Sequence, residues 1–245
     1  MAISKIVYKS SPSATPVTWM DATTATAAAA DITAPKTAML ADGVVTTGTG
    51  SGGGGITWVS LAKGQYPNGL ITLDSTVTQI RGQMFSYNSA NNWKVYAPYV
   101  TTSSGNEFKM AKNLTHVSMP ALTTVNTGYS FYQCTNLIVA DIGSADRIIN
   151  QFFNQATNFN TLILRKSTAI TTLGSTNCFS STNFNNGGSG GTIYIPKSLY
   201  DHLGDGTDYD YKSATNWSTL DGYGTITWEK LEGSIYESAD WILSV

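Results

Sequence analysis

The sequence contains few charged residues, few histidines and few cysteines. Asp, Glu, Lys and Arg together make up 12% of its 245 residues, which is about half of their usual share. The two histidines, His116 and His202, stand in unrelated contexts, and no zinc-protease, phosphate-loop or serine-hydrolase motif occurs anywhere in the chain. We therefore expect no enzymatic activity and no cofactor.

The two cysteines, Cys134 and Cys178, are too few for a disulfide-stabilised scaffold. They can pair with each other, or they can lie reduced in the core, which is the commoner state of isolated cysteines. Neither has a catalytic motif around it. The pattern favours two structural thiols and leaves the pairing open.

The sequence also lacks a basic cluster, a signal peptide and a long apolar run. The net charge is -2, and Lys and Arg are nowhere dense enough to neutralise a row of phosphates, so we expect no nucleic-acid partner. The opening MAISKIVYKSSPS has no apolar region of the secretory type. No stretch approaches the roughly 20 apolar residues of a membrane span. We expect synthesis in the cytoplasm without membrane insertion.

What the sequence does contain is a repeated phrase: FKMAKNL from Phe108, FYQCTNL from Phe131 and FNQATNF from Phe153. The opening Phe residues lie 23 and 22 positions apart, and Asn follows each of them by five residues. A fixed period in the low twenties is typical of a solenoid, in which identical short coils stack on one another. Weaker copies end on Phe85 and Phe179.

Each copy continues with alternating apolar residues, as in a short strand, and then with one further apolar position. The strand positions are Val117 and Met119, Ala140 and Ile142, and Leu162 and Leu164, and the further positions are Ile80, Val125, Ile148 and Ile170. In the outer copies we expect the strands at WKVYAP, which spans 93–98, and at TIYIP, which spans 192–196.

Stacked coils assign roles to these residues. The Phe residues form one buried column, and the Asn residues at the turns bond backbone groups of their own and the adjacent coil. The structural positions are Phe85, Phe108, Phe131, Phe153, Phe179, Asn113, Asn136 and Asn158. A ligand must therefore contact the outward positions between them.

Two groups of residues are candidates for binding. Aromatic rings beside Asn and Thr suit sugar recognition, and the candidates are Tyr87, Trp93, Tyr96, Tyr99, Tyr129 and Tyr132, of which several must instead lie in the core. The acidic stretch DHLGDGTDYD places Asp205, Asp208 and Asp210 close together. A solvated loop is the favoured interpretation of this stretch, and a calcium site is the alternative.

The phrase F-x-x-C-T-N-L at 131–137, with its neighbours, resembles the BspA-type leucine-rich repeats of bacterial surface proteins over about residues 70–196. This resemblance implies that Cys134 fills a small buried position. The closing stretches IYIPKSLYDHL and YKSATNWSTL resemble the ends of such repeats in phage and prophage proteins. MAISKIVYKS and KTAMLADGVVTTGTG are similar to leaders of phage structural proteins, although the alanine-threonine run between them departs from that pattern.

Together these features predict a mainly β protein: a short parallel β-solenoid of the leucine-rich-repeat (BspA) type with a mixed α+β cap. We expect an N-terminal attachment segment with a glycine-rich joint at 1–55, the solenoid at 56–196 and the cap at 197–245. Ser198 or a neighbour should cap a short helix in KSLYDHL.

The resemblance implies a non-enzymatic virion component, a fibre, decoration or tail appendage of a bacteriophage, which contacts a host surface protein or glycan. It would hold other virion proteins through residues 1–55, and a homotrimer is one assembly that such components form. The alternatives are a bacterial cell-surface adhesin with the same repeats and a protein that only stabilises the particle.

Overall fold

The computed structural model describes residues 69–73, 75–87 and 92–232, together with the backbone of four short strands nearer the N-terminus. The chain forms two compact units, one of Met1–Ala41 and Val45–Thr57 and the other of Asp42–Val44 and Trp58–Val245. In the first unit, β1 (Lys5–Tyr8) pairs antiparallel with β2 (Val17–Asp21), and β3 (Thr37–Met39) pairs antiparallel with β4 (Val45–Thr47). The rest of the predicted attachment segment lies outside the described residues.

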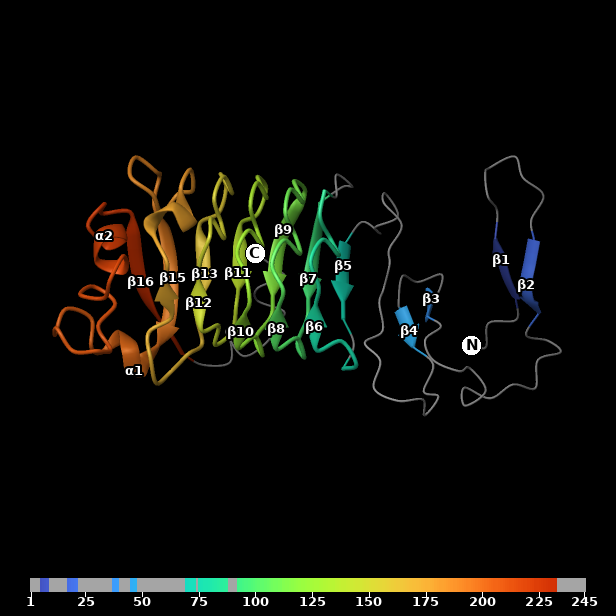
Figure 1. Cartoon of the computed structure of the whole chain (residues 1–245), viewed down its shortest axis with the longest axis horizontal. Helices are drawn as coiled ribbons and strands as arrows, with labels where there is room; N and C mark the ends of the chain where they lie inside the picture. Colours follow the sequence, from blue (N-terminus) through green and yellow to red (C-terminus); the bar gives the residue numbers. More distant parts are fainter. Residues whose placement is uncertain are drawn as a thin grey trace. The chain divides into compact units, whose positions relative to one another are not determined.

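The second unit is built on a seven-stranded sheet in which all neighbouring strands are parallel. The strands follow one another in chain order across the sheet (Figure 1). They are β5 (Gly69–Thr72), β7 (Trp93–Tyr96), β9 (Leu114–Ser118), β11 (Val139–Asp141), β13 (Thr161–Ile163), β15 (Gly191–Pro196) and β16 (Ile226–Leu231).

Two-residue strands form further parallel ladders. One sheet contains β6 (Gln79–Ile80), β8 (Thr102–Ser103) and β10 (Thr124–Val125), and the other contains β12 (Arg147–Ile148) and β14 (Thr172–Leu173). From β5 to β14, each long strand is therefore followed by a short strand and then by one of the Phe turns. The described part of the chain is mainly β, as predicted, with parallel sheets.

The core lies between the long and the short strands. Val95, Val117, Ala140, Leu162 and Ile193 occupy equivalent positions on five paired strands and are all fully buried. Parallel strands lie about 4.8 Å apart, so each of these side chains contacts its equivalents on both sides. Alternation along each strand sends its other side chains to the outer face of the sheet.

Threonine hydroxyls form hydrogen bonds between successive turns of the second unit. The Oγ1 atoms of Thr101, Thr123 and Thr127 donate hydrogen bonds to the carbonyls of Thr78, Thr101 and Ser104, each one coil earlier. Thr135 and Thr157 do the same to Lys112 and Thr135. The carbonyls of Thr78, Thr101, Lys112 and Thr135 also accept a backbone N–H, so each hydroxyl there adds a second hydrogen bond to the preceding turn.

Helices are short and lie at the C-terminal end of the second unit. They are the 3-10 turn η2 (Thr176–Phe179), α1 (Lys197–Tyr200) and α2 (Trp217–Asp221). None of the helices in the described part of the chain has the length and apolar character needed to cross a bilayer. The expected helix in KSLYDHL is present, but the predicted cap is wrong: Pro196 is its N-cap, and the Ser198 hydroxyl donates to the Ser167 carbonyl.

Candidate functional site

The Phe turns form one edge of the second unit, and their stacking is regular. Phe108 lies 5.2 Å from Phe85 and 5.2 Å from Phe131, centroid to centroid, with the rings within 4° of parallel. Phe153 lies 5.2 Å from Phe131, and Phe179 follows at 5.4 Å with a 30° tilt. All five rings are buried. The turns are therefore held at the spacing of the strands.

An unusual backbone conformation makes this stacking possible. The residues two before and two after the Phe ring adopt positive φ in the central turns, for example 64° at Tyr129 and 58° at Gln133 around Phe131. Because residues of left-handed and right-handed conformation alternate along the turn, the N–H group of every second residue points toward the next coil. The N–H groups of Tyr129, Phe131 and Gln133 accordingly donate to Asn150, Phe152 and Asn154 of the next coil at 2.8–3.0 Å. These bonds offset the cost of non-glycine residues in the left-handed region.

The asparagines form a ladder of a different kind from the one predicted. The Nδ2 of Asn136 donates to Oδ1 of Asn113 at 3.2 Å, and Nδ2 of Asn158 donates to Oδ1 of Asn136 at 3.4 Å. The side chains thus bond one another from coil to coil. Asn158 is exposed, and Asn113 and Asn136 are partly exposed, so the ladder lies at the surface of the turns.

The cysteine thiols are buried and not joined by a disulfide. Cys134 Sγ donates to the Phe108 carbonyl at 2.9 Å, and burial raises the pKa of this thiol far above its usual range. Cys178 Sγ donates to the Ile148 carbonyl at 3.5 Å. Cys134 occupies the same place in its turn as Ala111 and Ala156, three residues after the Phe ring, and all three small side chains are fully buried. Both thiols are structural.

Three of the candidate aromatic residues, Tyr87, Tyr129 and Tyr132, lie on the Phe turns, and we call them, with Lys109, the tyrosine edge. Tyr129 and Tyr132 meet edge to face at 5.8 Å and 73°. The Lys109 Nζ lies 5.4 Å from the Tyr129 centroid and 5.6 Å from the Tyr132 centroid, which is the range of cation–π contact. Tyr87 is 45% exposed.

An amide pair extends this edge. Gln133 Nε2 lies 3.3 Å from the Tyr132 hydroxyl and donates to Gln155 Oε1 at 2.7 Å. Amphipathic rings beside fixed amides and an ammonium group provide both the apolar contact and the hydrogen bonds that a polyhydroxylated ligand needs.

The other three candidate aromatics lie elsewhere. For Trp93 the prediction of a ligand-facing ring is wrong, because the indole is fully buried against Phe85 at 5.7 Å and Phe108 at 6.4 Å. Tyr96 is partly buried on the outer face of the long sheet, opposite Ser118. Tyr99 is 51% exposed in the loop after β7. The six residues do not form one site.

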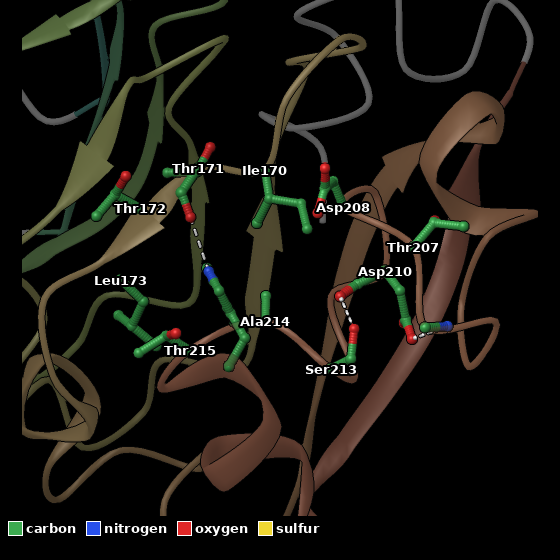
Figure 2. A pocket seen from close by; sticks show the side chains of 12 residues that line it. Ile170, Thr171, Thr172, Leu173, Thr207, Asp208, Asp210, Ser213, Ala214 and Thr215 are labelled. Carbon is green, nitrogen blue, oxygen red and sulfur yellow. Dashed lines mark hydrogen bonds between the residues drawn. The ribbon is translucent and has the colours of Figure 1, made fainter.

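A pocket of about 640 Å³ lies between residues 170–173 and the loop 206–217 (Figure 2). Threonine side chains and the exposed Asp208 line it. Trp217 also lines the pocket, and its Nε1 donates a hydrogen bond to the Thr171 carbonyl at 2.8 Å. The buried Tyr211 hydroxyl accepts from the Thr171 N–H at 3.4 Å, and burial raises the pKa of Tyr211 to about 12. Sequence reasoning missed this pocket; its signal was the stretched spacing of 26 residues between Phe153 and Phe179.

The acidic residues of this loop bind the backbone. Asp210 accepts hydrogen bonds from the N–H groups of Gly204, Gly206 and Lys212 at 2.8, 3.1 and 2.8 Å. Burial raises the pKa of Asp210, but these bonds together outweigh burial and hold it below its usual value. Asp205 accepts from the Thr207 N–H and contacts His202 Nδ1, and these two contacts lower its pKa.

These carboxylates do not converge on a common point, and the part of the chain that the structure describes contains no group of three His, Cys, Asp or Glu side chains that could hold a metal ion. The calcium alternative for Asp205, Asp208 and Asp210 therefore finds no support, since Asp210 uses both oxygens to hold the loop.

Comparison of the chain with protein-family models, with curated proteins and with solved structures gave no match.

Proposed function

We propose that this protein is a non-enzymatic display component of a bacteriophage virion, whose parallel β-solenoid of the leucine-rich-repeat (BspA) type presents the tyrosine edge to host-surface glycans. Stacked parallel strands, short ladders and a continuous Phe column support the solenoid interpretation. The leader and the closing phrases support the virion assignment. Attachment to other virion proteins is assigned to residues 1–55.

The observation that carries the binding function is the cluster of Lys109, Tyr129 and Tyr132. These three side chains are partly exposed, and they are fixed by turns whose backbone is bonded from coil to coil. A rigid aromatic surface loses little conformational entropy when a ligand binds. Sugar rings present apolar C–H faces that such a surface can cover while the hydroxyls reach the Gln133 and Lys109 donors.

A glycan-array and cell-adsorption experiment with the full chain tests this assignment. We expect Tyr132→Ala to weaken binding at least about tenfold, since a central aromatic contact is worth about 2 kcal/mol. Tyr209→Ala is the control, because Tyr209 is also a solvent-accessible tyrosine (43% exposed) but lies in the acidic loop. If both variants adsorb as the parent does, or if only the control loses binding, the tyrosine edge is not the contact surface.

The virion assignment has its own test. An antibody raised against the second unit should label purified particles of the phage that encodes the chain, and deletion of residues 1–55 should remove the protein from particles while leaving the second unit soluble. Absence of the full chain from purified particles would refute this part and favour the adhesin alternative. A particle protein without any adsorption activity would favour the purely stabilising one.

A further inference from the structure

The charges of the second unit are separated along the sheet. From 69 to 140, the described residues include four cations and one carboxylate, and from 141 to 232 they include six cations and nine carboxylates. With His counted as neutral, the formal charge is +3 over the first stretch and -3 over the second. Since the strands follow chain order, the two charges lie in opposite halves of the sheet (Figure 1).

The tyrosine edge lies in the positive half. Its residues belong to the turns that precede β7, β9 and β11. The acidic loop instead lies against residues 170–173, in the coil that ends at Phe179. Three stacking steps of 5.2–5.4 Å separate the Phe108 turn from the Phe179 turn. Together these steps exceed the screening length of about 8 Å at physiological salt, so the acidic loop does little to neutralise the edge.

The accessible charges of the Phe turns are all positive among the described residues. Apart from one carboxylate, Glu107, the charged side chains of these turns are Arg81, Lys109 and Lys112. Glu107 is 1% exposed, and its Oε1 accepts hydrogen bonds from the Ser103 hydroxyl and the Gly105 N–H, both at 2.6 Å. This carboxylate is therefore held inside its coil, where a ligand cannot contact it.

The Lys109 ammonium is held in place by aromatic rings instead of by an anion. Its Nζ lies within cation–π distance of both Tyr129 and Tyr132. In the part of the chain that the structure describes, no carboxylate forms an ion pair with this Nζ. An ammonium group has three N–H donors, and contact with ring faces leaves donors for a ligand. The edge thus presents a positioned positive charge.

We propose that the glycan bound at the tyrosine edge is anionic, and that its carboxylate or phosphate group contacts the Lys109 ammonium while a sugar ring covers Tyr129 and Tyr132. This inference rests on the proposed glycan binding and names the class of glycan. Lysine acts as a point charge without a two-point geometry, so either anion suits it. The exposed Lys112 on the same turn adds to the attraction. A neutral glycan satisfies the rings and the amides but leaves the ammonium without an anion.

Binding of the full chain to two matched pairs of saccharides tests this class. Oligogalacturonate and its methyl ester differ in the charge of one carboxyl group per sugar, and phosphomannan differs from its dephosphorylated form in phosphate. We expect an acidic member to bind at least about tenfold more tightly than its neutral counterpart at about 50 mM salt. The preference should shrink at about 0.5 M salt, because salt screens the charges. A preference within only one pair identifies the anion as carboxylate or phosphate.

Two lysines separate a local contact from the general charge of the protein. Lys109→Met should reduce the preference to less than about twofold, and Lys109→Arg should retain it. Lys230→Met is the matched control, because the Lys230 Nζ also lies over a ring, 5.1 Å from the Tyr200 centroid, but on β16 in the negative half. A preference that survives Lys109→Met, or that Lys230→Met reduces equally, would overturn the proposal.

The measurements also distinguish failure of this inference from failure of the proposed function. Equal binding of acidic and neutral saccharides, weakened in both cases by Tyr132→Ala, would refute the anionic class and leave glycan binding at the tyrosine edge intact. Binding to none of the four saccharides, while a neutral glycan binds on the array, would refute the same part. Absence of binding in both experiments would refute both.

Discussion

Removing one ring from the middle of the Phe column should cost more stability than its apolar surface alone explains. Phe131 stacks on Phe108 and on Phe153, and it meets Phe152 edge to face at 5.5 Å. Aromatic pairs contribute about 0.5–1.5 kcal/mol each beyond the area they bury. Phe131→Leu keeps an apolar side chain but loses all three pairs, so we expect a loss of about 3 kcal/mol in the free energy of unfolding.

The control is Ile142→Leu, a volume-conserving change of one aliphatic side chain at a fully buried position of the same core. It should cost less than about 1.5 kcal/mol. Equilibrium urea unfolding followed by far-UV circular dichroism measures both, with the midpoint shift converted at a common slope. Equal costs for the two variants would show that the Phe column fills space without stabilising the stack through its rings.

In the proposed solenoid each coil contacts only its neighbours, so the damage should also be local. Hydrogen exchange in Phe131→Leu should rise most in the turns around Phe108 and Phe153, whose N–H groups and carbonyls pair with the altered turn. Exchange that rises uniformly from β5 to β16 would contradict nearest-neighbour stacking and indicate one cooperative body.

Three further predictions concern buried polar groups. Arg165→Met should destabilise the protein by about 3–5 kcal/mol in urea unfolding, since it leaves the buried Asp141 carboxylate without its bidentate partner, and adding Asp141→Asn should recover part of the loss. Asp210 has a pKa below its usual value, so it stabilises the fold above about pH 4 and loses this effect as the pH falls through its folded-state pKa. The difference in melting temperature between the parent and Asp210→Asn should therefore shrink below about pH 4 and remain constant from about pH 5 to 8. Cys134 and Cys178 should not react with a disulfide reagent in the native chain, and two equivalents should react after unfolding.

The repeated phrase predicted the parts of the fold in which one residue type recurs at one place. The Phe residues at 108, 131 and 153 are chemically identical, so their period could be read directly, and the strands that follow them lie where the alternation indicated. The first strand, β5, was not predicted, because no phrase of this kind precedes it. The repeat period therefore predicts the strands that follow a Phe turn better than it predicts the first strand of the sheet.

Extra residues in one repeat caused the prediction of its third apolar position to fail. Ile170 was predicted as the third apolar position of its coil, but it is only partly buried, and Leu173 on β14 fills that place. The unit from Phe153 to Phe179 is longer than its neighbours, so a position counted from the Phe ring no longer matches the ladder. The same extra residues create one wall of the pocket.

Pairings that depend on register could not be predicted at all. Asp141 and Arg165 lie 24 residues apart, about one period, but nothing in the period indicates which outward residue turns toward its neighbour. Trp93 was misplaced for a related reason: an aromatic residue at the start of a strand serves equally well as a ligand contact or as packing for the Phe column, and only the register of β7 with β9 selects the second.

The direction of the hydrogen bonds explains why the chain needs its cap. Along the short strands, N–H groups donate backwards, as Thr172 and Gly174 do to Asp146 and Ile148, so carbonyls at the last coil point forward toward a coil that is not there. Asn216 and Trp217 supply the missing donors: Asn216 Nδ2 bonds the Leu173 carbonyl at 2.8 Å, and Trp217 Nε1 bonds the Thr171 carbonyl at 2.8 Å.

The aromatic cluster of Tyr211, Trp217 and Trp228 then buries this end of the stack. An open edge of this kind would otherwise be a template for pairing with another chain. The phrase that contains Asn216 and Trp217 therefore completes the hydrogen bonding of the last coil with side chains, and it ends the growth of the stack without a further repeat.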